Sequence, residues 1–151
     1  KLEVKMHVLR NVVDFANKIG ISRPKVAILS ATEEILESIQ SSIDANIITK
    51  RAKEENIKAD VFGPLAFDNS ISIEAANIKG IKNQVAGNAN IILVPNIETG
   101  NALVKIMVNF MDAVAGGFIT GGKVPVVISS RSDNVDSRLS SLSNAILSLR
   151  D

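Results

Sequence analysis

Apolar residues recur along the chain at two spacings, one typical of helices and one typical of buried strands. A first helix ending at Gly20 is predicted by apolar residues at every third or fourth position, namely Val4, Val8, Val12, Phe15 and Ile19. Similar patterns predict further helices at residues 44–55, 69–78, 98–115 and from 133 onward. Short apolar runs predict strands at residues 25–31, 59–61, 91–95, 118–120 and 124–129, and Phe62-Gly63-Pro64 predicts a turn.

Strands and helices therefore alternate along the whole chain. Because strand–helix–strand crossovers are right-handed and place helices on the faces of a sheet, this order predicts an α/β fold with a layered, mainly parallel sheet flanked by helices. In such folds, ligands bind outside the carboxyl ends of the strands. We therefore look for functional residues in the polar segments that follow predicted strands.

Composition narrows the function classes. The chain has 151 residues, a net charge of +1, no cysteine and a single histidine. The low net charge does not indicate a nucleic-acid partner. The absence of cysteine and the single histidine exclude a thiolate metal site, a multi-histidine metal site and a histidine-dependent triad. The apolar stretch at residues 102–120 is interrupted by Lys105, Asn109 and Asp112, so no membrane span and a cytoplasmic location are expected. The first residue is Lys, within an amphipathic pattern, which suggests a fragment.

The segment from Val124 to Asp136 has the strongest chemical signal. A predicted strand ends in Ser129, Ser130 and Arg131, and a helix follows. A helix N-terminus attracts anions, and the fork-shaped guanidinium of Arg131 suits phosphate. Ser130 offers a hydroxyl to an oxyanion, and Asp136, one turn further on, would act as a base if it points back into the same cleft. Alternatively, Asp133 only caps the helix and Asp136 only complements its dipole.

Weaker candidates follow other predicted elements. A short polar loop after the strand at residues 91–95 leads into a helix and includes Asn96, Gly100 and Asn101. Gly100 allows the backbone to approach a ligand closely, although a simple turn explains it equally well. The Gly121-Gly122 pair lacks the spacing of a phosphate-binding glycine loop. We treat the following as candidate substrate-binding residues: Ser129, Asn96, Gly100, Asn101, Gly121 and Gly122.

Three blocks, in the same order, resemble the phosphate acetyl/butyryltransferase family, and its butyryltransferase branch more closely. The first is GPLAFDNSIS at residues 63–72. The second joins VAGNAN at residues 85–90 to VPNIETGN at residues 94–101. The third is VPVVISSRSD at residues 124–133. Asn90 stands where the family usually has Asp, and Asn96 where either Asp or Asn occurs.

The resemblance implies reversible transfer of a short acyl group, acetyl to butyryl, between coenzyme A and inorganic phosphate. It implies that Asp136 takes the thiol proton, Ser130 stabilises the oxyanion and Arg131 holds phosphate charge, with no metal or cofactor and with coenzyme A as substrate. Family members are about twice this length, share an isocitrate/isopropylmalate dehydrogenase-like fold and form dimers. The alternative is a catalytically silent acyl-CoA-sensing domain of a larger enzyme, a role that requires the anion site but not the base.

The resemblance also implies how the chain is divided. Residues 24–130 correspond to the second of the family's two domains, and residues 131–151 to a closing helix that returns to the first, N-terminal domain. The active site of the family lies in the cleft between the two domains. We therefore expect the isolated chain to have little or no turnover.

Overall fold

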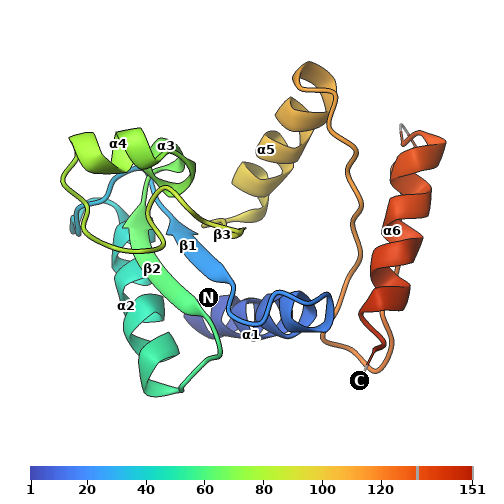
Figure 1. Ribbon diagram of the computed structural model, residues 1–151, viewed down its shortest axis with the longest axis horizontal. Coiled ribbons are helices and arrows are strands. Elements are labelled where there is room, and N and C mark those ends of the chain that lie inside the picture. The colour runs from blue at the N-terminus through green and yellow to red at the C-terminus, as the bar shows by residue number, and fades with distance from the viewer. Residues whose placement is uncertain (132, 151) are drawn as a thin grey trace.

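The computed structural model describes residues 1–131 and 133–150 and has a three-stranded parallel sheet in the order β2-β1-β3 (Figure 1). The α/β fold with a parallel sheet flanked by helices is confirmed. Its elements, in chain order, are α1 (Leu2–Lys18), β1 (Lys25–Leu29), α2 (Gln40–Glu54), β2 (Asp60–Leu65), α3 (Phe67–Ile71), α4 (Ile73–Ile78), β3 (Ile91–Leu93), α5 (Ile97–Phe110) and α6 (Val135–Leu147).

The central strand β1 is buried between two apolar layers. Side chains of successive strand residues point to opposite faces, so Val26 and Ile28 face α1 and α2, while Ala27 faces the other way. The α1–α2 layer contains Met6, Leu9, Val13, Ala45, Ile48 and Ala52. The opposite layer contains Leu65, Ala76, Val85 and Ala86, beneath α3 and α4. Burial on both faces explains why β1 is a continuous apolar run.

The first helix lies where the spacing predicted it, but its most buried residues are different ones. Met6, Leu9, Val13 and Ala16 are buried, whereas Val4 and Val8 are 57% and 44% exposed. The helix has apolar residues on two sides, and periodicity alone does not rank them. The longer side chains of Met6 and Leu9 are the ones that fill the space above β1.

The predicted turn at residues 62–64 is wrong, because β2 continues through it to Leu65. Gly63 allows the two strands to approach closely: a Cβ atom there would lie 2.6 Å from the carbonyl oxygen of Ile28.

The helix predicted at residues 69–78 is divided into α3 and α4. Ser72 separates them and caps α4, its Oγ accepting the N–H of Ala75 at 3.2 Å. α2 begins at Gln40, four residues earlier than predicted.

The strands predicted at residues 118–120 and 124–129 do not form. Among the described residues, this region has only one isolated antiparallel bridge, between Ile119 and Val126. The predicted strands have no neighbouring strand to complete a ladder, because the sheet ends at β3 on that side. α5 ends at Phe110 rather than at residue 115, and it has no buried residue.

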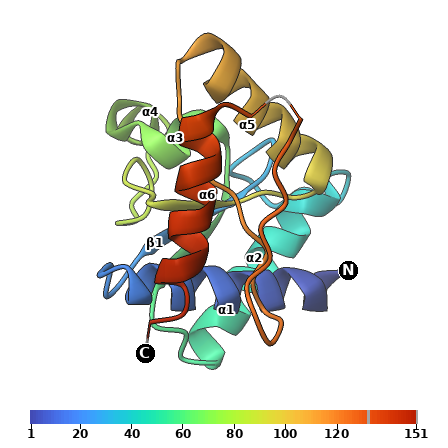
Figure 2. The ribbon, with the colours of Figure 1, turned by 90° about the vertical axis from the view of Figure 1, so that its right-hand side faces the viewer.

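The last part of the chain, residues 112–131 and 133–150, forms an arm that stands apart from the sheet (Figures 1 and 2). Within the arm, α6 uses its small residues to pack against the chain: Ser137, Ser141 and Ala145 are buried. Gly116 lies against this side, and a Cβ atom there would overlap the Oγ of Ser140. The larger apolar residues of α6 point outward.

The arm is attached to the rest of the molecule mainly through α1. The rings of Phe15 and Phe118 meet edge to face with centroids 4.9 Å apart. Lys18 Nζ donates to the carbonyl oxygen of Ser148 at 3.1 Å. α1 therefore connects the sheet core to the arm, although the division proposed from resemblance begins at residue 24. In the part of the chain that the structure describes, no helix has the length and hydrophobicity needed to span a membrane.

We predict that Leu9→Ala lowers the free energy of unfolding by about 2–5 kcal/mol, because it leaves a cavity in the α1–α2 layer. Val8→Ala is the matched control: Val8 is next in sequence but 44% exposed, so its effect should stay within about 0.5 kcal/mol. Urea denaturation of both variants measures the difference. Equal losses in the two variants would show that α1 does not pack as described.

Candidate active site

The strongest candidate residues lie where the extended part of the arm meets α6. The chain runs through Ser129, Ser130 and Arg131 and enters α6 at Val135, with Asp136 in the first turn of the helix. Asn134, not Asp133, caps the helix, since its Oδ1 accepts the N–H of Ser137 at 2.9 Å. The sequence alternative that Asp133 is the cap is therefore wrong.

Asp133 has a different role, because it closes a turn with Ser130. The N–H of Ser130 donates to Asp133 Oδ2 at 2.7 Å, and the N–H of Asp133 donates to the carbonyl oxygen of Ser130 at 3.1 Å. This turn fixes the backbone next to Arg131. Ser130, Arg131 and Asp136 are all exposed to solvent.

Chemically, this end of the arm combines a hydroxyl, a guanidinium and a carboxylate at a helix N-terminus. The helix dipole and the Arg131 charge both favour an anion, while the carboxylate of Asp136 is a proton acceptor. Within the described residues, no three histidine, aspartate or glutamate side chains come close enough together to hold a metal ion. The arrangement suits binding of an oxyanion beside a group that loses a proton.

Of the three predicted residues at the start of α5, Asn96 and Gly100 have structural roles in the chain. Asn96 caps α5: its Oδ1 accepts the N–H of Thr99 at 2.9 Å and the hydroxyl of Thr99 at 2.7 Å. Gly100 is in the first turn, where a Cβ atom would lie 3.1 Å from Val94 Cγ2. Asn101 is exposed on the same helix. No described interaction connects these three residues with Ser130, Arg131 or Asp136.

The Gly121-Gly122 pair lies at the opposite end of the arm. Gly121 has φ +97° and packs so closely on Asn11 of α1 that a Cβ atom would overlap that side chain. The C-terminal end of α6 is also at α1, through the bond between Lys18 and Ser148. Ser130 and Asp136 are at the other end of α6, about 20 Å away for a helix of this length. The structure thus separates the glycine pair from Ser130, Arg131 and Asp136.

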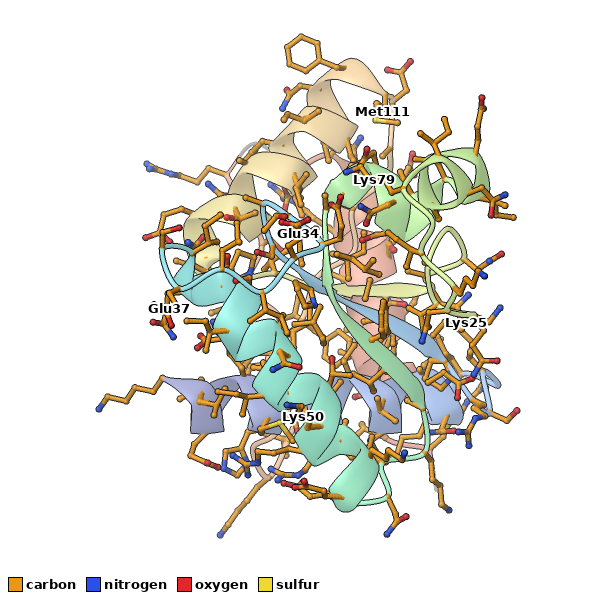
Figure 3. The ribbon with its side chains drawn as sticks, turned by 90° about the vertical axis from the view of Figure 1, so that its left-hand side faces the viewer. Lys25, Glu34, Glu37, Lys50, Lys79 and Met111 are labelled. Atoms are coloured by element: carbon orange, nitrogen blue, oxygen red, sulfur yellow. The ribbon has the colours of Figure 1, made fainter. Side chains whose placement is uncertain are left out.

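A polar cluster that the sequence interpretation missed lies beyond the carboxyl ends of β1 and β2. Lys79 Nζ is 3.1 Å from Glu33 Oε2 and 3.7 Å from Asp68 Oδ2. Asn69 is fully buried; its Nδ2 donates to Glu33 Oε2 at 3.3 Å, and its Oδ1 has no partner among the described protein atoms. Figure 3 shows Lys79 beside the loop that carries Glu34, the neighbour of Glu33.

The charged groups Glu33 and Lys79 shift each other's pKa. The hydrogen bond from Lys79 is the main reason that the pKa of Glu33 lies below its ordinary value, against a smaller opposing effect of burial. The same bond raises the pKa of Lys79. The sequence held one indication of this cluster. Glu33 follows β1 and Asn69 follows β2, so both lie at the edge of the sheet where α/β folds bind ligands.

The structure also explains why the blocks at residues 63–72 and 85–90 occur together. The N–H of Gly87 donates to the carbonyl oxygen of Asn69 at 2.8 Å, and that of Ala89 to Ser70 at 3.1 Å. Gly87 has φ +75°, and a Cβ atom there would lie 2.5 Å from the Cα of Ile73. The two blocks hold each other in place beside the sheet.

A hollow of about 550 Å³ contains none of the predicted site residues. It lies beside the amino end of β2, and its lining includes Arg23, Lys53, Lys58 and Asp60. Arg23 Nε already donates to Asp60 Oδ1 at 2.8 Å. Because this is the edge opposite to the one where parallel sheets bind ligands, the volume alone does not make it the active site.

The fold is similar to that of phosphotransacylases. A branched-chain phosphotransacylase from Enterococcus faecalis V583 superposes with a TM-score of 0.90 and 37% identity, over 98% of this chain and 53% of that one. The chain belongs to the phosphate acetyl/butaryl transferase family, whose model matches residues 2–144. This confirms the family resemblance predicted from the three sequence blocks.

Two relatives represent the two branches of the family. A phosphate acetyltransferase from Rhizobium meliloti is 45% identical over 147 residues, which is 97% of this chain and 46% of the relative. A phosphate butyryltransferase from Clostridium acetobutylicum is 40% identical over 148 residues, which is 97% of this chain and 49% of the relative. The chain therefore spans about half the length of these relatives.

We predict that Lys79→Met destabilises the chain at pH 7 and has a smaller effect at pH 3. Since folding lowers the pKa of Glu33, the stabilisation by the pair is complete above the ordinary glutamate pKa of about 4.3 and is lost as pH falls through the lower folded value. Folding raises the pKa of Lys79, so the stabilisation by the pair stays complete up to the ordinary lysine pKa of about 10.4. It is lost as pH rises through the higher folded value.

The measurement is the free energy of unfolding of wild type and variant at both pH values. Lys82→Met is the matched control, because Lys82 is exposed and has no ion pair among the described residues. A Lys79→Met effect of the same size at pH 3 and pH 7 would contradict the prediction.

Proposed function

We propose that the protein containing this chain transfers a short acyl group, acetyl to butyryl, between coenzyme A and inorganic phosphate. The observation that carries the proposal is the placement of Ser130 and Arg131 immediately before α6 and of Asp136 in its first turn. Support comes also from membership of a family whose relatives are named phosphate acetyltransferase and phosphate butyryltransferase. Acetyl-named and butyryl-named relatives match almost equally well, so the proposal covers the whole range of acyl lengths.

Asp136 is the proposed base. A thiol with a pKa of about 8.5 ionises readily near neutral pH when a carboxylate accepts its proton. The coenzyme A thiolate then attacks the carbonyl carbon of the acyl phosphate, forming the C–S bond and a tetrahedral oxyanion. The oxyanion collapses, the bond from carbon to the phosphate oxygen breaks, and inorganic phosphate leaves. The reverse reaction starts with attack by phosphate and returns the proton to the thiolate.

Ser130 and Arg131 are the proposed stabilising groups. The Ser130 hydroxyl donates to the developing oxyanion, and the guanidinium of Arg131 spreads the charge of the phosphoryl group. The turn that Asp133 closes with Ser130 holds this part of the backbone before substrate arrives. The chemistry uses these side chains and requires no metal or cofactor, so coenzyme A acts only as a substrate.

The proposed partners beyond the substrates follow from length and family. The chain spans 46% and 49% of two relatives, so we propose that an N-terminal domain of the same polypeptide supplies the other side of the cleft. A homodimer and a cytoplasmic location are further parts of the proposal. The alternative, an acyl-CoA-sensing domain, is favoured less, because a sensor has no need of a base at Asp136.

For the full-length gene product, we predict that Asp136→Asn lowers kcat by about 10²- to 10⁴-fold, because it removes the proton acceptor. The assay is phosphate-dependent release of coenzyme A from acetyl-, propionyl- and butyryl-CoA. Asp112→Asn is the control: Asp112 is exposed with φ +51°, a conformation that Asn also accepts. If Asp136→Asn releases coenzyme A as fast as the wild type, Asp136 is not the base. If the wild type binds acyl-CoA but releases no coenzyme A, the acyl-CoA-sensing alternative is supported.

We also predict that Arg131→Gln raises the KM for phosphate at least tenfold, whereas Arg131→Lys gives a smaller rise. Lysine keeps the charge but loses the fork that binds two oxygens at once. Arg150→Gln, exposed at the far end of the arm, is the control and should leave the KM unchanged. Phosphate titrations at saturating acyl-CoA measure these values. An unchanged KM in Arg131→Gln would assign the phosphate contact to another residue.

A further inference from the structure

The hollow at the amino end of β2 is built from separate parts of the chain. Its lining includes Arg23 from the loop before β1, Lys53 and Asn56 from the end of α2 and the turn after it, Asp60 from β2, and residues 83–85 from the loop after α4. Its volume of about 550 Å³ is typical of small-molecule sites, which measure about 300–1,000 Å³. None of the proposed catalytic residues is among the described residues that line it.

The hollow has an apolar, closed side and a polar rim. Ala52, Ala59 and Val85 line the closed side and are at most 7% exposed. Asn56 and Gln84, which also line the hollow, are exposed and carry side-chain amides. Ligand sites commonly combine apolar walls with a few polar groups that orient the ligand.

The rim carries an excess of positive charge. The charged residues of the lining are three cations, Arg23, Lys53 and Lys58, and one carboxylate, Asp60. Arg23 pairs with that carboxylate, its Nε lying 2.8 Å from Asp60 Oδ1. Lys53 and Lys58 are exposed and have no ion pair among the described residues. Two positive charges at the hollow are therefore not balanced by the part of the chain that the structure describes.

The end of α2 explains only part of this charge. Lys53 lies in the last turn of α2, where a cation complements the negative end of the helix dipole. Lys58 and Arg23 lie outside the helix, so its dipole does not account for them. The backbone holds this side of the hollow in place, because the N–H of Asp60 donates to the carbonyl oxygen of Pro24, next to Arg23, at 2.9 Å.

The lining favours one class of ligand. A phosphate monoester carries nearly two negative charges at neutral pH and so matches the two unpaired lysines. The side-chain amides of Asn56, Asn83 and Gln84 both donate to and accept from hydroxyl groups. A nucleotide base usually stacks on an aromatic ring, and the described lining contains no aromatic residue. A phosphorylated polyhydroxy compound therefore fits the hollow better than a nucleotide does.

We propose that the hollow is a binding site for a small phosphorylated polyhydroxy compound of the sugar phosphate class, with Lys53 and Lys58 holding the phosphate. Parallel sheets bind their substrates at the opposite edge, so this ligand is an effector and not a substrate of the proposed transfer. Binding stabilises the folded protein by mass action, since the site exists only when α2 and β2 are packed together.

Calorimetric titration of the full-length gene product with glucose 6-phosphate tests the site. We expect saturable binding by the wild type, and about tenfold weaker binding by Lys53→Gln and by Lys58→Gln, because each loses one charge-assisted bond to the phosphate. Lys50→Gln is the matched control: Lys50 is exposed on the same helix but outside the lining, so this variant should bind as the wild type does. Absence of binding by the wild type would overturn the proposal, as would equal binding by the wild type and both lining variants.

Three other compounds test the class of ligand. Glucose, which lacks the charge, should not bind, and inorganic phosphate, which lacks the hydroxyl groups, should bind at least tenfold more weakly than glucose 6-phosphate. Equal binding of inorganic phosphate would mean that the hollow takes any anion, and tighter binding of AMP would make a nucleotide the ligand; either result overturns the proposal.

One variant separates this site from the proposed acyl transfer. Asp136→Asn should bind glucose 6-phosphate as tightly as the wild type does, whatever its rate of coenzyme A release. Binding by a full-length product that releases no coenzyme A would uphold the effector site and contradict the proposed function. Phosphate-dependent release by a product that does not bind glucose 6-phosphate would do the reverse.

Discussion

The packing of α1 on β1 is the contact on which the rest of the structure depends. Met6 and Leu9 cover Val26 and Ile28, and this layer buries one face of the central strand. The same helix holds the arm on another side, through Phe15 against Phe118, Asn11 against Gly121 and Lys18 on the carbonyl of Ser148. Loss of α1 packing would therefore disturb the sheet and the arm together, although no proposed catalytic residue lies on α1.

The polar residues of the three family-like blocks have two kinds of role. In the first two blocks, Asn69 and Ser70 accept backbone bonds from Gly87 and Ala89, and Asn96 caps α5. These contacts hold loops beside the carboxyl edge of the sheet. In the third block, Ser130 and Arg131 are exposed, and the N–H of Ser130 donates to Asp133 Oδ2. A motif therefore does not tell whether its residues hold the local structure or are available for chemistry. The tertiary structure separates these two roles.

Both α5 and α6 carry apolar side chains that the described part of this chain leaves exposed. Phe110 is 85% exposed, and Met111, at the tip of α5, is 68% exposed (Figure 3). Such side chains lose the stabilisation that burial of apolar area brings. The sheet and its two layers nevertheless form within this chain, because β1, β2 and β3 find each other through nearby crossovers.

The sequence by itself determined the alternation of helices and strands, the parallel sheet and the family, because periodicity and ordered motifs are local properties. It also located Ser130, Arg131 and Asp136 at a helix start. Only the tertiary structure decided which side of α1 and α6 is buried, that Gly63 continues a strand, and that Asn134 rather than Asp133 is the cap. It likewise brought Glu33, Asn69 and Lys79 together and left residues 118–120 and 124–129 without a sheet. The reason is physical: burial and strand pairing depend on neighbours distant in sequence, and no local pattern specifies whether those neighbours are present.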